Sequence, residues 1–527
     1  MIDIRQLDLE KDRRIIITSD IHTNLPLFKR LLEKVEYSTE DYLFIVGDLC
    51  EKGQDSLSTI AYVRELSAQS DRVFITKGNC DVVHDYVFNN VEGVKNYMTQ
   101  RKDSILNEML AAQGKSLEEF ASLDELGQFY LLHYRDEIEW LNSLPIAYET
   151  NDYILIHAGI ENIQNWKETT YEVALYTPSF YEKGHQADKT VIVGHWPTVN
   201  YRAKTVSSNN PVIDLENRII SMDGGNRIKR DGQLNAILIE GEEISYTYVD
   251  DLKEQIVYAT HTDKTGRTGT VTYPNYELKI IREEPFFTLC ENKTLGIEQW
   301  IKNEFIQDGV CKGDISTTML SVREGETVSI VHDQCEGYVL VKKGDGTVGW
   351  IPKKCLSPEV QIRKAVAGDE QQIAEICINA QWATYSDMYD KSYIEGVIEK
   401  FYTPARIRQE IMETNKEWNG YFVAVQNGKI VGAIGGGMID EKVAEVYVLY
   451  LDPAKRGEGI GSKLLSYLTD FQKRSYSAEE QWVSVAKDNE KGIPFYEARG
   501  FVKMEERMSY ESRPEDQAVS LRMKRKL

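Results

Sequence analysis

Six side chains that can bind a metal through an oxygen or nitrogen atom follow directly after apolar runs. This pattern constrains the fold more than any other feature of the sequence. They are Asp20, His22, Asp48, Asn79, His157 and His195. The runs before them, at 15–18, 42–46, 73–76, 153–156 and 191–193, are rich in β-branched residues and predict strands. Because sites in open α/β sheets assemble at the carboxyl ends of strands, these five ends predict one shared site.

The chemistry of these side chains indicates a pair of metals. Carboxylate, amide oxygen and imidazole together suit Mn, Fe or Zn better than Ca. Asp48 has two carboxylate oxygens and can bridge two cations about 3.5 to 4 Å apart, next to a water whose pKa falls towards roughly 7. Any one of these Asp or His residues alone is more often a cap or an ordinary loop residue. The ordered set predicts two divalent metals (Mn, Fe or Zn) and a water as nucleophile.

Five ordered motifs carry a resemblance to a known family. They are Asp20-x-His22, Gly47-Asp48, Gly78-Asn79-x-Asp81, His157-Ala158-Gly159 and Gly194-His195, followed by Asp223-Gly224-Gly225. Over about residues 13–250 the chain resembles the calcineurin-like metallophosphoesterases, and within them the phosphoprotein phosphatases and bacterial diadenosine tetraphosphatases. The resemblance implies an α/β sandwich in which Asp20, His22 and Asp48 hold one metal. It implies that Asp48, Asn79, His157 and His195 hold the other. For Asp223, a purely structural role is the alternative to a role in the site.

Two departures from the family affect its catalytic residues. The family has a His after Gly-Asn that works with an Asp as a general acid or orients the phosphate, whereas this chain has Cys80. Asp81, in the same motif, is among the residues expected to be catalytic. A thiol replaces that imidazole poorly, so either another group such as His84 protonates the leaving oxygen or the substrate has a good leaving group. For Cys80 itself we expect a small buried thiol. The family's phosphate-binding arginines fall at Lys52 and Lys77, and lysine lacks the bidentate fork of arginine.

Length, charge and cysteine count set the broad class. A chain of 527 residues is too long for one core and predicts about three domains. The net charge of -22 argues against nucleic-acid or anionic-membrane partners. Seven cysteines without a C-x-x-C pair predict neither a disulfide framework nor a thiolate zinc site. The first twenty residues are rich in charged side chains, and no later segment is long and apolar enough to span a bilayer. Both observations predict a cytoplasmic location.

The chain is expected to be multidomain, and the first two units differ in pattern. We assign 1–258 to the metallophosphoesterase, with a helical pattern from Val87 to Leu144 that is expected to overhang the site. The stretch 260–269 is expected to be a linker or an exposed hairpin. Short alternating runs at 286–357, with Gly349-Trp350-Ile351-Pro352, resemble an SH3 domain and imply a small SH3-like β-barrel. A spacer is favoured over a peptide reader, and Trp350 is equally plausible in a core or a groove.

The third unit, 360–527, contains a glycine-rich turn that opens a helix from Ser462. Such a turn exposes backbone N–H groups that accept a pyrophosphate. Arg456-x-x-Gly459-x-Gly461, Asn489 and Pro494-Phe495-Tyr496-Glu497-x-x-Gly500-Phe501 resemble the GCN5-related N-acetyltransferases, so an α/β acetyltransferase (GNAT) fold is implied.

The resemblance to the acetyltransferases also assigns roles to residues. It implies that acetyl-CoA is held at its pyrophosphate by amides of Arg456, Gly457, Glu458, Gly459, Ile460 and Gly461. Leu449 and Leu451 would pair with the pantetheine arm, and Asn489 would hydrogen-bond the cofactor. Tyr496 would protonate the departing thiolate, or is a packed aromatic residue. Glu445 would deprotonate the amine directly or through water, an assignment that stays open.

These patterns predict a bifunctional enzyme. One half is a metal-dependent phosphatase for a phosphorylated protein or a nucleotide. The other half is an acetyl-CoA-dependent N-acetyltransferase whose amine acceptor is a small molecule or a protein. Two alternatives stay open: an acetyltransferase with a weak or degenerate phosphatase domain, and a regulatory scaffold that binds metal and CoA without turnover.

Overall fold

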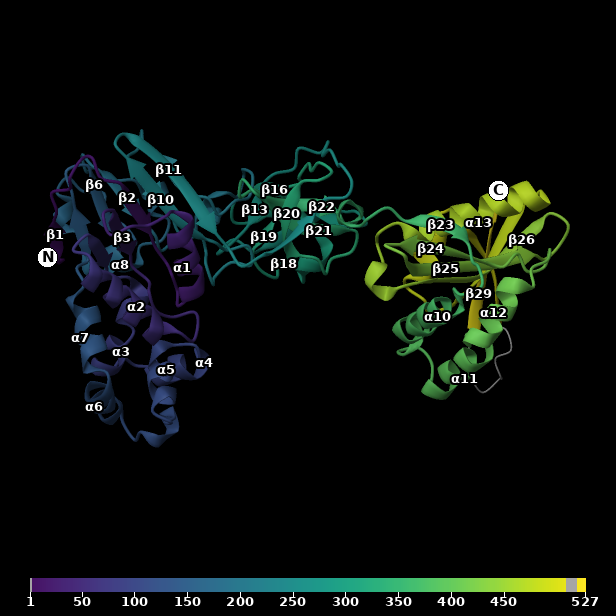
Figure 1. The fold of residues 1–527 in the computed structure, drawn as a ribbon, viewed down its shortest axis with the longest axis horizontal. Coiled ribbons are helices and arrows are strands. Elements are labelled where there is room, and N and C mark those ends of the chain that lie inside the picture. Colours follow the sequence, from purple (N-terminus) through teal and green to yellow (C-terminus); the bar gives the residue numbers. More distant parts are fainter. Residues whose placement is uncertain (1, 509–518) are drawn as a thin grey trace.

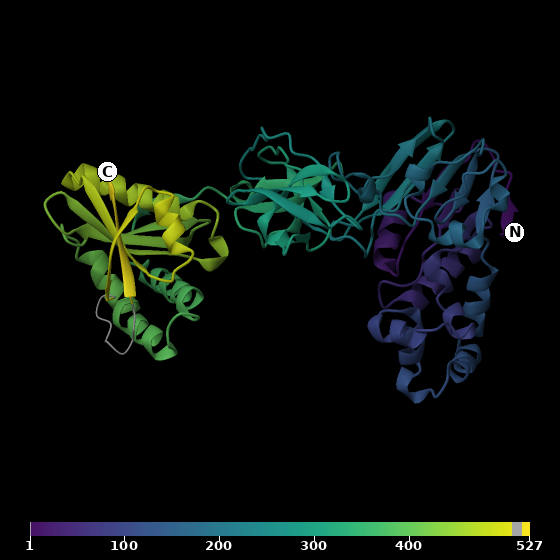
Figure 2. The same cartoon turned by 180° about the vertical axis from the view of Figure 1, so that it is seen from behind.

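The computed structural model describes residues 2–508 and 519–527. Figure 1 shows three bodies in a row along the longest axis, and Figure 2 shows the same row from behind. The N-terminal body is a sandwich with a helical lobe, the middle body consists of short strands, and the C-terminal body is one sheet with helices on it. None of the helices in the described ranges has both the length and the apolar character needed to cross a bilayer.

The N-terminal body contains two sheets that face each other. Their strands are β1 (Ile4–Gln6), β2 (Ile15–Thr18), β3 (Tyr42–Val46), β4 (Val73–Thr76), β5 (Ala147–Glu149), β6 (Tyr153–Ile156), β7 (Thr190–Val193), β8 (Val212–Asp214), β9 (Ile219–Ser221), β10 (Leu234–Glu240) and β11 (Glu243–Val249). One sheet has the order β1-β5-β6-β7-β9-β8 and the other β11-β10-β2-β3-β4. Ile17 and Phe44 of the second sheet share a buried cluster with Tyr148, Ile192 and Ile220 of the first. This shared layer confirms the predicted sandwich.

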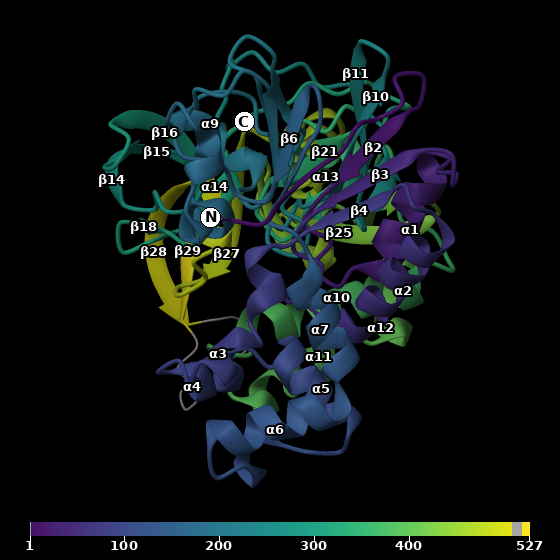
Figure 3. The ribbon, with the colours of Figure 1, turned by 90° about the vertical axis from the view of Figure 1, so that its left-hand side faces the viewer.

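Helices cover the outer faces of the sandwich and form a lobe at one end. They are α1 (Leu25–Lys34), α2 (Ser56–Gln69), α3 (Asp85–Phe88), α4 (Val94–Gln100), α5 (Ile105–Ala112), α6 (Leu123–His133), α7 (Arg135–Ser143), α8 (Tyr171–Tyr176) and α9 (Phe180–Lys183). In α1 the buried residues Leu27, Phe28, Leu31 and Leu32 follow helical spacing, so one face packs on the sheet. The lobe of α3 to α7 extends away from the sandwich, as Figure 3 shows, and matches the helical pattern expected from the sequence.

The middle body is made of short strands in several small sheets. Its strands are β12 (Lys253–Ile256), β13 (Thr270–Val271), β14 (Leu278–Glu283), β15 (Phe287–Asn292), β16 (Ile297–Lys302), β17 (Ile306–Gln307), β18 (Val310–Cys311), β19 (Ile315–Ser316), β20 (Thr327–His332), β21 (Tyr338–Lys343) and β22 (Val348–Pro352). The largest sheet has the order β12-β20-β21-β22. Trp350 is fully buried and its indole N–H donates to the carbonyl of Ser316 over 2.7 Å, so this residue belongs to the core.

The middle body begins earlier than the sequence indicated. Strand β12 pairs with β20 in the register Lys253↔Ile330, so the segment before residue 286 is already part of this body. The stretch 260–269 is also attached to it, because His261 and Val322 exchange two backbone hydrogen bonds of 2.9 Å. The SH3-like barrel itself stays a prediction.

Ion pairs join the middle body to the sandwich. The Lys342 ammonium, almost fully buried, lies 2.9 Å from Asp250 Oδ2 and 3.0 Å from Gln233 Oε1. The buried Lys229 ammonium lies 2.5 Å from Asp314 Oδ2. Because breaking one partner of a buried pair leaves an uncompensated charge, these contacts hold the two bodies in one arrangement.

The C-terminal body is a seven-stranded sheet with helices on both faces. Its elements are β23 (Gln361–Lys364), α10 (Glu370–Tyr385), α11 (Lys391–Phe401), α12 (Pro404–Met412), β24 (Tyr421–Gln426), β25 (Lys429–Met438), β26 (Val443–Leu451), α13 (Ile460–Tyr476), β27 (Glu480–Ala486), α14 (Gly492–Glu497), β28 (Val502–Met508) and β29 (Val519–Lys526). The order is β23-β24-β25-β26-β27-β29-β28. Helix α13 packs on one face through Leu464, Leu465 and Leu468, and α10 and α12 pack on the other through Ile373 and Ile407.

Candidate functional sites

The six side chains expected to bind metal come together in the N-terminal body. Asp20, His22, Asp48 and Asn79 follow β2, β3 and β4 of one sheet, whereas His157 and His195 follow β6 and β7 of the other. The strand ends therefore converge from both layers of the sandwich, not from one open sheet. All six are buried except Asn79 and His195, which are half-buried.

Asp48 lies between the two groups of ligands. Its Oδ1 is 3.4 Å from His157 Nε2 and accepts a hydrogen bond from the Cys80 amide over 2.8 Å. Its Oδ2 is 3.7 Å from His22 Nε2. Burial alone would raise the pKa of Asp48, but His157, His22 and the Cys80 amide together hold it below its usual value. The carboxylate is thus ionised and faces imidazoles on both sides.

The histidine rings are oriented by carbonyl oxygens outside the cluster. His22 Nδ1 lies 3.2 Å from the Cys50 carbonyl, and His157 Nδ1 lies 3.0 Å from the Val46 carbonyl. A contact of this kind fixes the tautomer with the proton on Nδ1 and leaves Nε2 as an electron-pair donor. Asn79 Oδ1 lies 3.0 Å from His157 Nε2, which completes that half of the cluster.

The electrostatics of the cluster fit divalent cations. His22 Nε2 is buried and has no hydrogen-bond partner in the described part of the chain. Burial, Asp223 and Asp48 raise the pKa of Asp20 well above its usual value. Burial lowers the pKa of His195 to about 4, so this imidazole is neutral near pH 7. Neutral imidazoles beside crowded carboxylates form a donor set that a cation would stabilise.

The backbone at the ligands is held in an uncommon conformation. Asp20, His22, Asp48 and His195 have φ values of 55°, 46°, 55° and 65°. Non-glycine residues at positive φ cost free energy and persist where the surrounding structure enforces them, often at functional sites. The concentration of such values at four of the six expected ligands agrees with a preorganised site.

The Asp81 carboxylate is bound to backbone amides of the two loops that hold Asp48 and Asn79. Asp81 Oδ2 accepts hydrogen bonds from the backbone N–H groups of Asp48 and Gly78, each over 2.9 Å. Asp81 Oδ1 accepts hydrogen bonds from the N–H groups of Leu49 and Cys50, over 2.9 and 3.2 Å. Burial and the charge of Asp48 raise the pKa of Asp81 to about 6. With both oxygens used by backbone groups, Asp81 holds the loops after β3 and β4 together.

The other expected catalytic and phosphate-binding residues are divided between two places. His84 is buried, with Nε2 3.0 Å from Asn142 Oδ1, and Lys77 donates to the Asn142 carbonyl over 3.1 Å. Both therefore contact the end of α7. Lys52 is half-buried and makes no hydrogen bond or ion pair with any described residue. Burial lowers the pKa of His22, and the charge of Lys52 contributes to this shift.

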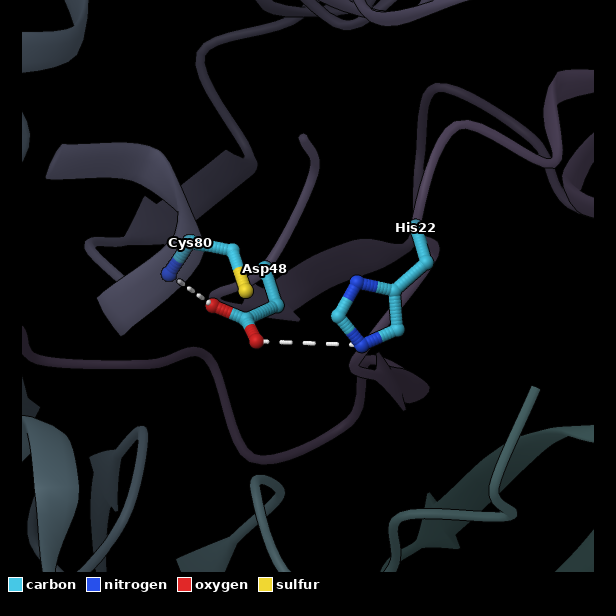
Figure 4. A group of neighbouring side chains, drawn as sticks. All are labelled: His22, Asp48 and Cys80. Atoms are coloured by element: carbon cyan, nitrogen blue, oxygen red, sulfur yellow. Dashed lines mark hydrogen bonds and ion pairs between the residues drawn. The ribbon is translucent and has the colours of Figure 1, made fainter. Parts of the chain in front are cut away.

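Three residues near the cluster were not assigned to it from the sequence. The Cys80 thiol lies beside His22 and Asp48, with the three ligand atoms within 4.8 Å of one another (Figure 4). Asp223 is fully buried, and its Oδ2 has no partner in the part of the molecule that the structure describes. Glu51 accepts Tyr97 Oη over 2.5 Å and the Ile105 amide over 2.8 Å, which ties the loop after Asp48 to the helical lobe. Cys80 and Asp223 lie within the sequence motifs, so their positions could have indicated a place near the cluster. Glu51 lies outside these motifs, and the sequence gives no such indication for it.

In the C-terminal body, β26 and β27 separate along their length. The two strands pair in parallel only from Val443↔Glu480 to Val446↔Val483. Beyond that point Leu449 and Leu451 pair with Ile434 and Gly432 of β25 alone. The other edge of this part of β26 is therefore free to pair with an extended ligand, as expected for the pantetheine arm.

The glycine-rich turn lies directly after β26 and begins α13. Gly459 has φ 80° at the N-terminus of this helix, a conformation that glycine adopts readily. Among the described residues the N–H groups of 457–459 make no hydrogen bond. Arg456 donates to Thr384 Oγ1 over 2.9 Å. Free N–H groups at the positive end of a helix can donate hydrogen bonds to a pyrophosphate, so the turn fits the expected cofactor.

The middle body contacts this turn. The Gly337 amide nitrogen would lie 2.9 Å from a Cβ at position 457, so the close approach of the two backbones requires glycine there. Glu458 has a carboxylate oxygen that is buried without a partner in the described ranges. The turn is thus partly covered by the loop between β20 and β21.

The remaining expected acetyltransferase residues lie around the separated strands. Asn489 Oδ1 accepts the Gly492 amide over 2.7 Å, and Tyr496 packs between Phe495 and Phe501. Burial raises the pKa of Tyr496, so its hydroxyl keeps its proton near pH 7. Glu445 is buried and forms an ion pair with Arg522. The structure therefore gives Glu445 a cationic partner that the sequence did not indicate.

Comparisons with known proteins match two separate segments. The model of the calcineurin-like phosphoesterase family matches residues 13–238, and the model of the acetyltransferase (GNAT) family matches residues 382–501. The symmetrical bis(5'-nucleosyl)-tetraphosphatase of Nitrosospira multiformis is 30% identical over 135 residues, which are 25% of this chain and 38% of that protein. The spermidine N(1)-acetyltransferase of Thermoplasma acidophilum is 28% identical over 143 residues, which are 27% of this chain and 88% of that protein.

One of the solved structures found by comparison is an acetyltransferase. The PaiA N-acetyltransferase of Thermoplasma acidophilum, in complex with coenzyme A, is 24% identical. The match covers 32% of this chain and 99% of that chain, with a TM-score of 0.28. The chain spans 38% of the length of the tetraphosphatase that it matches.

Proposed function

Since residues 13–238 belong to the calcineurin-like phosphoesterases and residues 382–501 to the GNAT acetyltransferases, we propose that this chain is a bifunctional phosphatase and N-acetyltransferase. The observation that carries the first activity is the buried cluster around Asp48, with the imidazoles of His22 and His157 on the two sides of one carboxylate. The observation that carries the second is the set of free N–H groups at the start of α13.

In the phosphatase half, Asp20, His22 and Asp48 would hold one metal, and Asp48, Asn79, His157 and His195 the other. When bound, two such cations supply Lewis-acid chemistry at phosphorus and at the attacking water. The carboxylate, amide and imidazole groups of this set are ligands that Mn, Fe and Zn all accept. Lys52, whose charge acts on His22, would attract the substrate phosphate as a point charge.

The residues around the cluster favour a substrate with a good leaving group. Position 80 has a thiol where an imidazole would donate a proton, and His84 Nε2 is turned to Asn142. A phosphoserine or phosphothreonine ester leaves as a basic alkoxide that needs a proton donor, whereas a phosphoanhydride leaves as a weakly basic phosphate. We therefore place nucleoside polyphosphates ahead of phosphoproteins as substrates. The relationship to a bis(5'-nucleosyl)-tetraphosphatase supports the same choice.

Turnover of three substrates tests this order. With Mn present, the full chain is expected to hydrolyse diadenosine tetraphosphate and an aryl phosphate faster than a phosphoserine peptide, because only the peptide requires strong leaving-group protonation. Initial rates of phosphate or nucleotide release at equal enzyme concentration give the comparison. Faster release from the peptide would contradict the order, and no release from any substrate by metal-loaded protein would leave the scaffold alternative.

In the acetyltransferase half, the turn at 456–461 would hold acetyl-CoA and the free edge of β26 its pantetheine arm. Tyr496 would donate a proton to the departing thiolate, and Glu445, steadied by Arg522, would accept the proton of the amine directly or through water. The acceptor class we propose is a cationic polyamine. The net charge of -22 attracts such a molecule, and a spermidine acetyltransferase is among the relatives.

A glutamate at position 459 is expected to weaken acetyl-CoA binding at least about tenfold, or about 1.4 kcal/mol. Gly459→Glu would place a carboxylate and a side chain at the N–H groups that would donate hydrogen bonds to the pyrophosphate. Gly428→Glu is a matched control, because Gly428 has φ 74° in a hairpin turn with open space around it. Calorimetric titration with acetyl-CoA measures both. Equal affinity in the two variants would reject the role of the turn.

A further inference from the structure

The Cys80 side chain faces the polar cluster and not an apolar core. It lies in the short helix Asn79–Val82, and its amide donates to Asp48 Oδ1 over 2.8 Å. Its Sγ, His22 Nε2 and an Asp48 oxygen lie within 4.8 Å of one another, and Figure 4 shows the three side chains turned to a common point. Asn79 Nδ2 lies 3.5 Å from the sulfur. The neighbours of this thiol are therefore metal-binding atoms.

The orientation of His22 independently points to a ligand at this position. Its ring is 1% exposed, and its Nδ1 faces the Cys50 carbonyl over 3.2 Å. Its Nε2 has no partner in the described part of the molecule. Leaving a buried polar atom unpaired costs roughly 1 to 3 kcal/mol, so such atoms usually bind a water, an ion or a ligand. A cation between His22, Asp48 and Cys80 would be such a partner.

We infer that Cys80 is itself a ligand of the metal held by His22 and Asp48, and that its sulfur makes this position selective for thiophilic cations such as Zn²⁺ over Mn²⁺. The inference rests on the proposed two-metal phosphatase and adds a ligand to it. Soft thiolate ligands favour Zn, whereas carboxylates and water suit Mn. Binding forms a metal–sulfur bond and releases the thiol proton to solvent, without any oxidation. Cys80, which stands where the family has a histidine, thus changes the metal preference of the site.

Cobalt spectroscopy and X-ray absorption of the full chain test the metal–sulfur bond. Co²⁺-loaded protein is expected to show a near-ultraviolet band of thiolate-to-cobalt charge transfer, and Zn²⁺-loaded protein a sulfur neighbour at about 2.3 Å. Both signals should disappear in Cys80→Ser. Cys290→Ser is the matched control, because Cys290 is also buried and free but lies in the middle body, on β15. Its signals should equal those of the original protein.

Competition between metals tests the selectivity. Cys80→Ser is expected to lower the affinity for Zn²⁺ at least about tenfold, which is the lower end of what loss of an outer-shell partner costs. The affinity for Mn²⁺ should fall by a smaller factor. If Cys80→Ser does not fold, Cys80→Asp keeps an anionic ligand, and it should bind metal without the sulfur signals.

The outcomes separate this inference from the proposed function. Metal-loaded original protein without the cobalt band and without a sulfur neighbour would overturn the role of Cys80 while leaving the two-metal site in place. The same holds if Cys80→Ser keeps both signals or if its Zn²⁺ and Mn²⁺ affinities fall equally. Failure of the original protein to bind any of the three cations would overturn the two-metal phosphatase together with the inference.

Discussion

Replacing Asp48 with Asn is expected to lower the hydrolysis of diadenosine tetraphosphate about 1000-fold, the upper end of what loss of one transition-state contact costs. The carboxylate places Oδ1 3.4 Å from His157 Nε2 and Oδ2 3.7 Å from His22 Nε2, so it serves both halves of the cluster. An amide has one oxygen, and its NH₂ group can donate but not accept. One of the two metal positions would therefore lose its shared ligand. Acetyl transfer should be unchanged, because the glycine-rich turn is in another body.

The comparison needs kcat/KM for both activities in each variant. Asp71→Asn is the control, because Asp71 precedes β4 in the same sheet and its side chain is 94% exposed. It removes the same charge at a place where the solvent replaces the contact. Unchanged phosphatase turnover in Asp48→Asn would remove this residue from the centre. A parallel fall in acetyl transfer would show that the substitution damages the whole chain and not the metal site.

The expected metal ligands could be placed from the sequence because each follows an apolar run. A run such as Ile15–Thr18 must end in a loop, and the residues of that loop lie at the sheet edge. The division of these loops between two sheets could not be predicted, since it depends on long-range pairing. Strand β5 forms a local antiparallel hairpin with β6, but it also pairs in parallel with β1 in the register Ile4↔Ala147, a contact between segments that only the folded chain brings together.

Other features have no periodic signal at all. Strand β12 reads Lys-Glu-Gln-Ile and is mostly exposed, so its pairing with β20 left no apolar alternation in the sequence. The cationic partner of Glu445, Arg522, lies 77 positions away on β29. His22 Nε2 is left without a partner because the other ring nitrogen, Nδ1, faces the carbonyl of Cys50, and the sequence does not indicate this contact. Motif and periodicity place a residue at the site, but the direction of its side chain is set by backbone contacts.

Removing the carboxylate of Asp81 is expected to destabilise the N-terminal body by about 4 kcal/mol. Its two oxygens accept four buried amides, those of Asp48, Leu49, Cys50 and Gly78. Each unsatisfied buried donor costs roughly 1 to 3 kcal/mol, and the contributions of neighbouring groups are not additive. For a body of this size, such a loss lowers the melting temperature by about 10 °C. Scanning calorimetry of Asp81→Ala in the full chain measures the transition of the N-terminal body.

Asp85→Ala is the matched control, because Asp85 lies in the same segment, has a side chain 40% exposed and makes one contact of 3.6 Å with His84. It should change the melting temperature little, since surface substitutions usually fall within about 0.5 kcal/mol. Asp81→Asn should be intermediate, because the amide oxygen still accepts two of the four donors. Equal melting temperatures for Asp81→Ala and Asp85→Ala would show that these amides are satisfied in another way. Asp81 would then no longer account for the position of Asp48.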